Sequence, residues 1–477
     1  MAKIAGEGLT FDDVLLIPQR SGVASRKDVD TSSPLTPKIK LAVPIISSNM
    51  DTVTEAPMAA AMAQQGGLGI IHRFMSIEDQ VSQVLKVKRL EGLIIKNPYT
   101  IGPNLTLAEA REIMDRYDTS VLVVDRHRRL LGILTFRDLR FERDFKKTVS
   151  QAMTKGKKLV TGSPTINIER AEALLHKHRI EKLPLVDRQG RLVGLITSKD
   201  LIKRIKFPTA TKDEQGRLRV GAAIGVKEGF LERAKALIEA EVDVLVVDIA
   251  HGHSELAIET VKAVKKRFPK MEVIAGNVAT AQGVRDLQAV GADAVKVGVG
   301  PGSVCTTRIV AGSGYPQLSA VMNCARTAKV PLIADGGIRY PGDIAKALAA
   351  GAQTVMIGNL LAGTEESPGS LITKDGRRYK LYRGMAGVGA NLAKKDAEGN
   401  EVEDQLLLDE MTPEGIDALV PYRGTVKEVL RQLVGGLRSG MSYSGARHIK
   451  QLQQKAQFIR LTGAGITESR SHDVKEL

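Results

Sequence analysis

Short runs of apolar residues recur along the chain, and most precede a segment in which apolar residues return every three or four positions. This alternation is typical of buried strands that alternate with helices. Eight such runs stand out, at 43–47, 68–72, 221–226, 242–248, 272–277, 294–298, 330–335 and 353–358. Eight parallel strands joined by crossover helices predict an α/β fold, a (β/α)8 TIM barrel.

The carboxyl ends of these runs carry polar residues and glycines. In a barrel of parallel strands all such ends meet on one face, where the active site of this fold is built. The polar ends lie at 47–49, 248, 276–277, 298–302, 335–337 and 358–359. The sequence therefore predicts a functional site at this face.

The regular spacing breaks between the second and third runs, where too many residues intervene for a single loop. This stretch contains an internal repeat, because VLVVDRHRRLLGILTFRDL at 121–139 matches KLPLVDRQGRLVGLITSKDL at 182–201. Several matches at one offset indicate two copies of one structural unit. The shared positions are Asp125, Gly132, Thr135 and Asp138 in the first copy and Asp187, Gly194, Thr197 and Asp200 in the second.

The repeat divides the chain into three expected segments. Residues 1–95 form the first part of a catalytic barrel, and residues 207–477 form its second part. Between them, residues 96–206 form an inserted domain with copies at about 96–147 and 153–206.

The inserted repeat resembles a pair of CBS modules, the Bateman domain. The resemblance implies that each G-x-x-T-x-x-D stretch contacts an adenine or guanine nucleotide, with Thr near phosphate and Asp on ribose. It assigns this regulatory role to Thr135, Asp138, Thr197 and Asp200. The alternative is that the two aspartates only cap helices, a role that Asp fills well.

The segment KVGVGPGSVCTTR at 296–308 carries the most chemistry. Its glycines allow a tight turn that can point backbone amides at a ligand. Ser303 adds a hydroxyl suited to phosphate, and Cys305 offers a nucleophilic thiolate on the predicted active face. Thr307 can relay a proton. The second cysteine, Cys324, lies on an expected helix face and should pack as a small hydrophobic residue.

A second cluster has the composition of a phosphate cradle. Asp335-Gly336-Gly337 ends the seventh run and Ile357-Gly358-Asn359 ends the eighth. Phosphate often binds at the loops after the last two strands of a (β/α)8 barrel. The segment 382–385 follows as an expected lid over a nucleotide.

Composition narrows the class of protein. With 43% hydrophobic and 26% charged residues, the chain is neither disordered nor collagen-like, and two cysteines cannot form a disulfide scaffold. The net charge of +15 favours anionic partners, but its dispersion favours a phosphorylated small substrate over nucleic acid. No signal peptide or apolar run of membrane-spanning length is evident, so we expect a cytoplasmic protein with no membrane partner.

Eight motifs are similar to those of the inosine-monophosphate dehydrogenase/GMP reductase family, and the resemblance covers nearly the whole chain. They are GLTFDDVLL (8–16), NMDTVTE (49–55), DIAHGHS (248–254), AGNVAT (275–280), GVGPGSVCTTR (298–308), ADGGIRYPGDI (334–344), YRGMAG (382–387) and TGAGITES (462–469).

The resemblance implies a mechanism and a set of site residues. Cys305 adds to carbon 2 of the purine, and hydride passes between that carbon and a nicotinamide. Asp335 binds the substrate ribose, and Asp248 binds the nicotinamide ribose with Asn277 and Gly298 nearby. The other substrate-binding residues are Ser48, Met50, Ser303, Gly337, Gly358, Asn359, Tyr382, Gly384, Met385 and Ala386.

The resemblance also implies a monovalent cation, typically potassium, and an assembly. The cation would bind carbonyls of Gly300, Gly302 and Cys305, with Glu468 and Ser469 completing the site from a neighbouring subunit. The family forms homotetramers that pair into octamers through CBS contacts, and purine nucleotides at the CBS pair are expected to regulate activity.

The two branches of this family differ after the shared covalent step. The resemblance implies that a dehydrogenase flap carries an Arg-Tyr pair whose Arg activates water. The flap expected at about 388–411 has neither residue, and Lys394 and Lys395 lack the planar fork of Arg. We therefore predict a GMP reductase that converts GMP and NADPH to IMP, ammonia and NADP. Thr307 and Glu414 would then protonate the departing ammonia.

Two alternatives stay open. An IMP dehydrogenase with an unusual flap would convert IMP, NAD and water to XMP and NADH, and the CBS insertion and the TGAGITES tail favour it. A non-enzymatic nucleotide sensor or nucleic-acid binder would use the CBS pair and the basic charge, and would not need Cys305.

Overall fold

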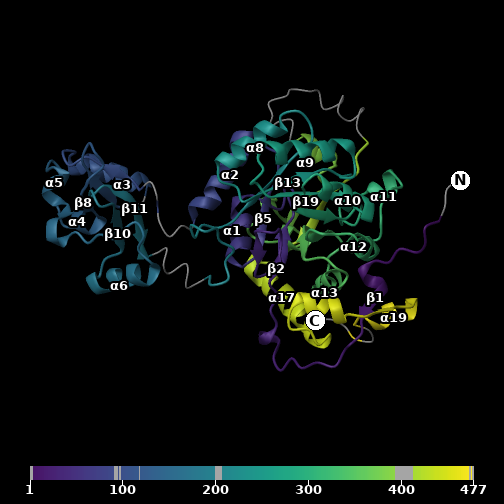
Figure 1. Ribbon diagram of the computed structural model, residues 1–477. Helices are drawn as coiled ribbons and strands as arrows, with labels where there is room; N and C mark the ends of the chain where they lie inside the picture. Colours follow the sequence, from purple (N-terminus) through teal and green to yellow (C-terminus); the bar gives the residue numbers. More distant parts are fainter. Residues whose placement is uncertain are drawn as a thin grey trace. The chain divides into compact units, whose positions relative to one another are not determined.

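The computed structural model describes residues 4–90, 95, 98–117, 119–198, 207–392, 412–471 and 474. The chain forms two compact units (Figure 1). One unit comprises Met1–Leu90, Thr209–Asp213 and Leu218–Leu477, and the other comprises Glu91–Pro208 and Glu214–Arg217. Most of the predicted flap, residues 393–411, lies outside the described residues, as does Asp200.

The first unit contains a closed barrel of eight parallel strands, which confirms the predicted fold class. Each predicted run coincides with one barrel strand to within two residues at either end. In barrel order the strands are β12 (Gly221–Ile224), β13 (Val244–Asp248), β14 (Val273–Val278), β15 (Ala294–Val297), β16 (Leu332–Asp335), β17 (Thr354–Ile357), β4 (Ile45–Ser47) and β5 (Leu68–Ile71). Because β5 pairs directly with β12, the barrel closes across the inserted segment.

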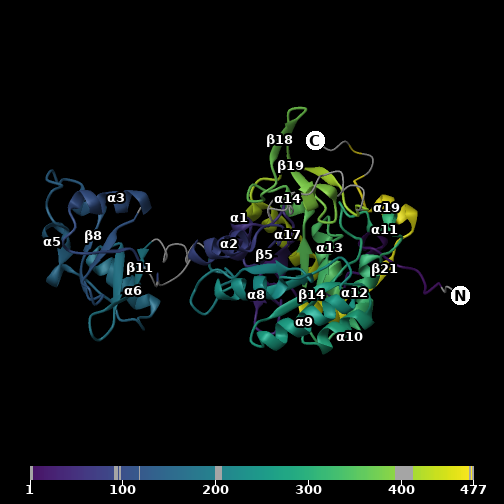
Figure 2. The ribbon, with the colours of Figure 1, turned by 90° about the horizontal axis from the view of Figure 1, so that it is seen from above.

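Helices surround this barrel (Figure 2). Hydroxyl side chains cap several of them, as Ser254, Thr280 and Thr425 accept hydrogen bonds from amides of the first turn. The helices of this unit are α1 (Ala56–Gln64), α2 (Ile77–Leu90), α8 (Phe230–Glu239), α9 (Glu255–Arg267), α10 (Ala281–Ala289), α11 (Thr307–Val310), α12 (Gln317–Ala325), α13 (Pro341–Ala349), α14 (Asn359–Ala362), α17 (Val426–Tyr443), α18 (Ile449–Lys455) and α19 (Gly463–Glu468).

The core of the barrel unit is aliphatic, as the scarcity of aromatic residues requires. An inner cluster fills the barrel with side chains such as Ile46, Ile70, Val246 and Ile333. A larger cluster lies between the strands and the helices. This burial of apolar area is the main stabilising term of the fold, and it fixes the strand ends that carry the polar residues.

Smaller elements complete the unit. Two short helical turns, η1 (Phe11–Asp13) and η2 (Arg26–Asp28), lie near the amino terminus. The strands β18 (Leu371–Lys374), β19 (Arg377–Arg383) and β20 (Asp417–Pro421) form an antiparallel sheet, and the β18–β19 hairpin projects from the barrel (Figure 2). Two further pairs are β1 (Val14–Leu16) with β21 (Phe458–Arg460) and β2 (Ser33–Pro34) with β3 (Lys40–Leu41).

The second unit contains the internal repeat, and each copy has a helix followed by an antiparallel strand pair. The first copy has α3 (Leu107–Tyr117), β7 (Val121–Val124) and β8 (Leu130–Leu134); the second has α6 (Ile168–His178), β10 (Lys182–Val186) and β11 (Leu192–Thr197). The remaining elements are β6 (Thr100–Ile101), α4 (Phe136–Leu139), α5 (Val149–Ala152), β9 (Thr154–Lys155) and η3 (Gly156–Lys158).

Asp138 caps a helix in this unit. The backbone amide and the hydroxyl of Thr135 both donate to the Asp138 carboxylate at 2.8 Å, which forms a capping box at the start of α4. Nucleotide binding by Thr135, Asp138 and Thr197, and the identity of this unit as a CBS pair, stay predictions.

Within the described residues, no helix combines the length and the apolar character that a membrane span requires.

Candidate functional site

The cysteine loop follows β15 and leads into α11 on the carboxyl face of the barrel. Gly300 has a φ of +79°, a left-handed conformation that favours glycine. Cys305 is half-buried, and its thiol donates a hydrogen bond to the Thr307 hydroxyl at 3.2 Å. In contrast, Cys324 is buried on α12, and burial raises the pKa of its thiol to about 12. Of the two cysteines, only Cys305 is placed for chemistry.

Two other chain segments brace this loop through backbone hydrogen bonds. The amide of Thr306 donates to the carbonyl of Glu414 at 2.9 Å, and the amide of Ile416 donates to the carbonyl of Val304 at 3.0 Å. The amide of Glu414 in turn donates to the carbonyl of Ala386 at 3.1 Å. The structure thus brings the predicted residues Cys305, Ala386 and Glu414 into one network. Among the described residues, no hydrogen bond joins the Glu414 carboxylate to the Thr307 hydroxyl.

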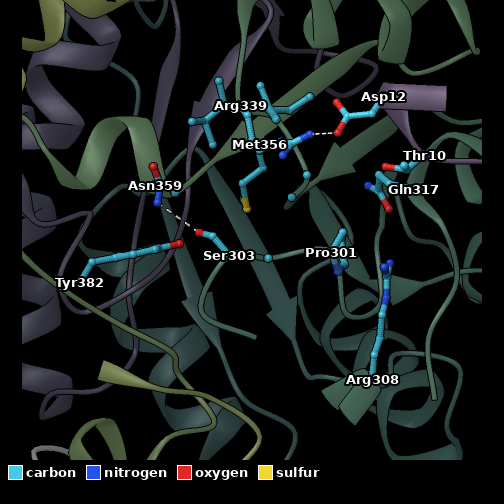
Figure 3. Close-up of a pocket in the computed structure, with 16 residues that line it drawn as sticks. Thr10, Asp12, Pro301, Ser303, Arg308, Gln317, Arg339, Met356, Asn359 and Tyr382 are labelled. Carbon is cyan, nitrogen blue, oxygen red and sulfur yellow. Dashed lines mark hydrogen bonds and ion pairs between the residues drawn. The ribbon is translucent and has the colours of Figure 1, made fainter. Parts of the chain in front are cut away.

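A cavity of about 420 Å³ opens beside this loop (Figure 3). It is lined by residues of the three strand-end loops that the sequence singled out, together with the amino-terminal segment. The lining residues are Thr10, Asp12, Pro301, Gly302, Ser303, Arg308, Gln317, Gly336, Gly337, Ile338, Arg339, Met356, Ile357, Gly358, Asn359 and Tyr382.

Backbone amides and hydroxyl groups give this cavity the chemistry of a phosphate site. The Asn359 amide donates to the Ser303 hydroxyl at 3.2 Å, which joins the loops after β15 and β17 (Figure 3). A side chain at Gly358 would place a Cβ atom 2.6 Å from the Tyr382 hydroxyl, so this approach requires glycine. The predicted phosphate residues Ser303, Gly337, Gly358, Asn359 and Tyr382 therefore all meet in one cavity.

Tyr382 contributes a hydroxyl that stays protonated. The side chain is buried, and burial raises its pKa to about 12. It therefore acts as a hydrogen-bond donor over the physiological pH range.

Two methionines mark the neighbouring region expected to hold the purine base. The Tyr382 hydroxyl lies 3.6 Å from the sulfur of Met50, and the amide of Asp51 lies 3.4 Å from the sulfur of Met385. An ion pair at 3.4 Å between Arg383 and Asp51 fixes the Met385 segment against the Met50 segment. The backbone amide of Ser48, two residues before Met50, donates to the carbonyl of Ile357 at 3.0 Å. This hydrogen bond connects the Met50 segment to the end of β17.

The two predicted ribose-binding aspartates are joined by a lysine that the sequence did not single out as a site residue. The Lys296 ammonium lies 2.7 Å from an Asp248 oxygen and 3.1 Å from an Asp335 oxygen. The Asn277 amide donates to the same Asp335 oxygen at 2.8 Å and to the carbonyl of Gly298 at 2.8 Å. Asp248, Asn277, Gly298 and Asp335 thus form one cluster around Lys296.

Charge pairing favours the ionised forms of Asp248 and Lys296. Burial alone would raise the pKa of Asp248, but the Lys296 ammonium beside it lowers the pKa below its ordinary value. Burial alone would lower the pKa of Lys296, but the carboxylates of Asp248 and Asp335 raise it above its ordinary value. Ionised carboxylates are strong acceptors for ribose hydroxyl groups.

Several residues of the site were not predicted from the sequence. Gln317 is buried and donates from its amide to the carbonyls of Val297 and Asp335, at 2.8 and 3.0 Å. Arg339 is paired with Asp12 at the cavity rim. The sequence offered one indication of the role of Lys296, namely its position inside the apolar run AVKV. A charged residue in a buried strand needs partners. Arg339 and Gln317 carried no comparable signal.

The residues predicted to bind a monovalent cation are less closely grouped than the residues of the nucleotide site. The carbonyl of Gly302 accepts the amide of Cys305 at 3.1 Å, and the Ser469 hydroxyl donates to the carbonyl of Gly465 at 2.7 Å. Glu468 is exposed at the end of α19. In the described part of the chain, no group of three or more His, Cys, Asp or Glu side chains is suited to a metal ion. The potassium site stays a prediction.

Comparison with known proteins places this architecture in one family. Residues 8–472 match the IMP dehydrogenase / GMP reductase domain. The chain is 56% identical over 475 residues to the inosine-5'-monophosphate dehydrogenase of Aquifex aeolicus, covering 98% of this chain and 96% of that protein. It is 52% identical over 481 residues to the enzyme of the same name from Bacillus subtilis, covering 99% and 97%.

A solved structure is similar along the whole chain as well. It is a GMP reductase variant from Trypanosoma brucei in complex with guanosine 5'-monophosphate, with a TM-score of 0.91, 48% identity and 98% coverage of each chain. The protein is an oxidoreductase and belongs to the IMP dehydrogenase/GMP reductase family.

The prediction of a GMP reductase is wrong. Relatives that are 50–56% identical over nearly the full chain carry the name inosine-5'-monophosphate dehydrogenase. The prediction rested mainly on the Arg-Tyr pair that the flap lacks. That absence is a weak criterion, because a water molecule can be activated by any suitably placed base and not only by arginine.

Proposed function

We propose that this protein is an IMP dehydrogenase, which converts IMP, NAD and water to XMP and NADH. The full-length similarity to proteins of that name carries the proposal, because it covers 98% of this chain at 56% identity. The geometry of the site supports it, since a half-buried thiol stands beside a cavity with phosphate-binding character.

The chain's own residues position the nucleotide for attack. The IMP phosphate binds the amides and hydroxyls of the cavity, including Ser303 and Tyr382, and its ribose binds Asp335. The hypoxanthine ring then lies between Met50 and Met385, above Cys305. Holding the reacting atoms in this geometry supplies a large part of the rate enhancement.

Cys305 carries the covalent step. As its sulfur bonds to carbon 2 of the purine, the thiol proton passes through the Thr307 hydroxyl to the neighbouring ring nitrogen, and that carbon then loses a hydride. Bound NAD supplies the acceptor for that hydride. Water then attacks the same carbon and the carbon–sulfur bond breaks, which releases XMP and restores the thiol. The Thr307 hydroxyl, 3.2 Å from the sulfur, is positioned to move the proton in either direction.

The residues present fit a bound dinucleotide. Asp248 ends β13 with a partly exposed carboxylate that Lys296 keeps ionised, which suits the diol of a nicotinamide ribose. Glu414 adds an acidic side chain on the segment whose backbone hydrogen-bonds to the cysteine loop. A potassium ion at Gly300, Gly302 and Cys305, regulatory purine nucleotides on the second unit, and a homotetramer that pairs into octamers belong to the same proposal.

The activity test mixes the purified protein with IMP and NAD and follows NADH by absorbance. A parallel reaction contains GMP and NADPH. The proposal expects NADH formation in the first reaction and no NADPH consumption in the second. NADPH consumption with ammonia release, and no NADH from IMP, would contradict it.

A further inference from the structure

Lys296 lies at the centre of four consecutive barrel strands. It extends from β15 and is 1% exposed, with Asp335 on the neighbouring strand β16 and Asp248 two strands away on β13. Asn277, from the strand between them, donates to the Asp335 oxygen that also contacts Lys296. The two carboxylates are therefore connected through one nitrogen atom.

The hydrogen-bonding capacity of Lys296 is fully directed to these neighbours. Its ammonium donates to Asp248 at 2.7 Å and to Asp335 at 3.1 Å, and it lies 3.9 Å from the sulfur of Met356. An ammonium has three hydrogens and no lone pair. Lys296 is thus not placed to exchange a proton with the purine, and its role is to position other groups.

Removing the ammonium would change both carboxylates at once. Two oxygens that contact one nitrogen at 2.7 and 3.1 Å lie within about 6 Å of each other, on either side of a buried ammonium. Without the intervening cation they repel, and one of them must take up a proton or turn away. A protonated or displaced carboxylate is a poorer acceptor for ribose hydroxyls.

We propose that Lys296 is a positioning residue that holds the substrate-ribose carboxylate of Asp335 and the cofactor-ribose carboxylate of Asp248 as one unit. Binding of IMP and binding of NAD then depend on the same side chain, although neither nucleotide needs to touch it. This inference rests on the proposed function, in which the two aspartates bind the two riboses.

The barrel contains a matched control for this arrangement. Lys88 on α2 is buried and also joins two carboxylates, at 3.1 Å from Asp213 and 2.6 Å from Asp243. Asp243 precedes β13, whereas Asp248 ends the same strand, so the two lysine bridges lie at opposite ends of the barrel. Loss of Lys88 removes a comparable bridge far from the nucleotide site.

The test compares Lys296→Met with Lys88→Met in the full-length protein. Kinetics give the KM for IMP, the KM for NAD and kcat, and calorimetry gives the Kd of IMP and the Kd of NAD, each measured without the other nucleotide. For Lys296→Met we expect both KM values and the Kd of IMP to rise about tenfold or more. Lys296→Arg restores the charge and should recover part of the affinity for IMP and part of the affinity for NAD. Lys88→Met should lower the melting temperature and leave both KM values within about twofold.

Each result of this comparison either supports the proposal or overturns it. An unchanged KM for both nucleotides, or a change in only one, would overturn the proposal. Equal changes in Lys88→Met would overturn it too, because they would indicate a general loss of structure. If Lys296→Met does not fold, Lys296→Gln, which keeps a donor and removes the charge, is measured against the same criteria. The calorimetric Kd values of IMP and NAD do not require turnover, so absence of XMP formation would disprove the proposed function and still leave this inference testable.

Discussion

The thiol of Cys305 lies 3.2 Å from the hydroxyl of Thr307, the first residue of the short helix α11. The relationship joins a nucleophile to a group that can relay its proton. The backbone hydrogen bonds between Thr306 and Glu414 and between Ile416 and Val304 hold this pair against the segment that contains Glu414. Nucleophile, proton relay and substrate cavity therefore form one preorganised site.

Loss of the nucleophile should abolish turnover. For Cys305→Ala we expect kcat to fall by at least ~1,000-fold, because the proposed mechanism requires the sulfur to bond to carbon 2. Binding of IMP, measured by calorimetry, should remain within about tenfold of the wild-type value.

The second cysteine supplies the control for that experiment. Cys324→Ala should keep near-normal kcat, and iodoacetamide should modify Cys305 and spare Cys324, whose buried thiol has its pKa raised to about 12. Equal loss of activity in both variants would disprove a specific role for Cys305.

Removal of the Thr307 hydroxyl should slow the chemical step. For Thr307→Val we expect kcat to fall ~100-fold with little change in the KM for IMP, because the hydroxyl contacts the thiol and not the phosphate cavity. The neighbouring Thr306→Val is the matched control, since its side chain makes no capping hydrogen bond at α11. Steady-state kinetics of both variants check the prediction, and equal kcat values for the two would contradict it.

Tyr382 should contribute to phosphate binding. For Tyr382→Phe we expect the KM for IMP to rise about tenfold while kcat changes little, because a donor to a charged group is lost. Tyr379→Phe alters the same strand, β19, outside the cavity and should leave the KM unchanged. A normal KM for Tyr382→Phe would exclude the tyrosine from the phosphate site.

The raised pKa of Tyr382 also predicts a pH dependence of stability. Its pKa is raised from 10.0 to about 12 by burial, so the unfolded chain releases this proton at lower pH than the folded protein does. The stabilising contribution is therefore fully present below pH ~10 and is lost as pH rises toward ~12. The free energy of unfolding of Tyr382→Phe should fall less than that of the wild type between pH ~9 and ~11, as measured by urea denaturation. Parallel pH dependence of both proteins would contradict this origin.

The barrel should keep its activity without the inserted unit. Because β5 pairs directly with β12, a short Gly-Ser linker in place of residues 91–208 should preserve the barrel and most of kcat. The same variant should lose any response of the reaction to added adenine or guanine nucleotides. Activity assays with and without ATP and GTP check both expectations, and a nucleotide response that persists in the variant would contradict them.

The sequence predicted the barrel well because each strand is a short apolar run with a polar end. All eight runs coincide with a barrel strand, from β4 to β17, although the bounds of runs and strands differ by one or two residues. The cavity followed from the same logic, since the loops after β15, β16 and β17 were expected to hold phosphate and they line one cavity.

The sequence was weaker where function depends on contacts between distant residues. Lys296 looked like one more position in an apolar strand, and its bond to two carboxylates 48 and 39 residues away becomes visible only in three dimensions. The reductase prediction failed for a related reason, because it was based on the composition of a flap and not on the geometry of a base. Asp138 had two interpretations, and the structure places it in a capping box.

The most direct test of the central claim is mass spectrometry of the nucleotide formed from IMP and NAD in water enriched in heavy oxygen. An IMP dehydrogenase that acts through a purine adduct on Cys305 should release XMP that carries one heavy oxygen atom from the solvent. Absence of XMP, together with conversion of GMP and NADPH to IMP in the parallel reaction, would contradict the account.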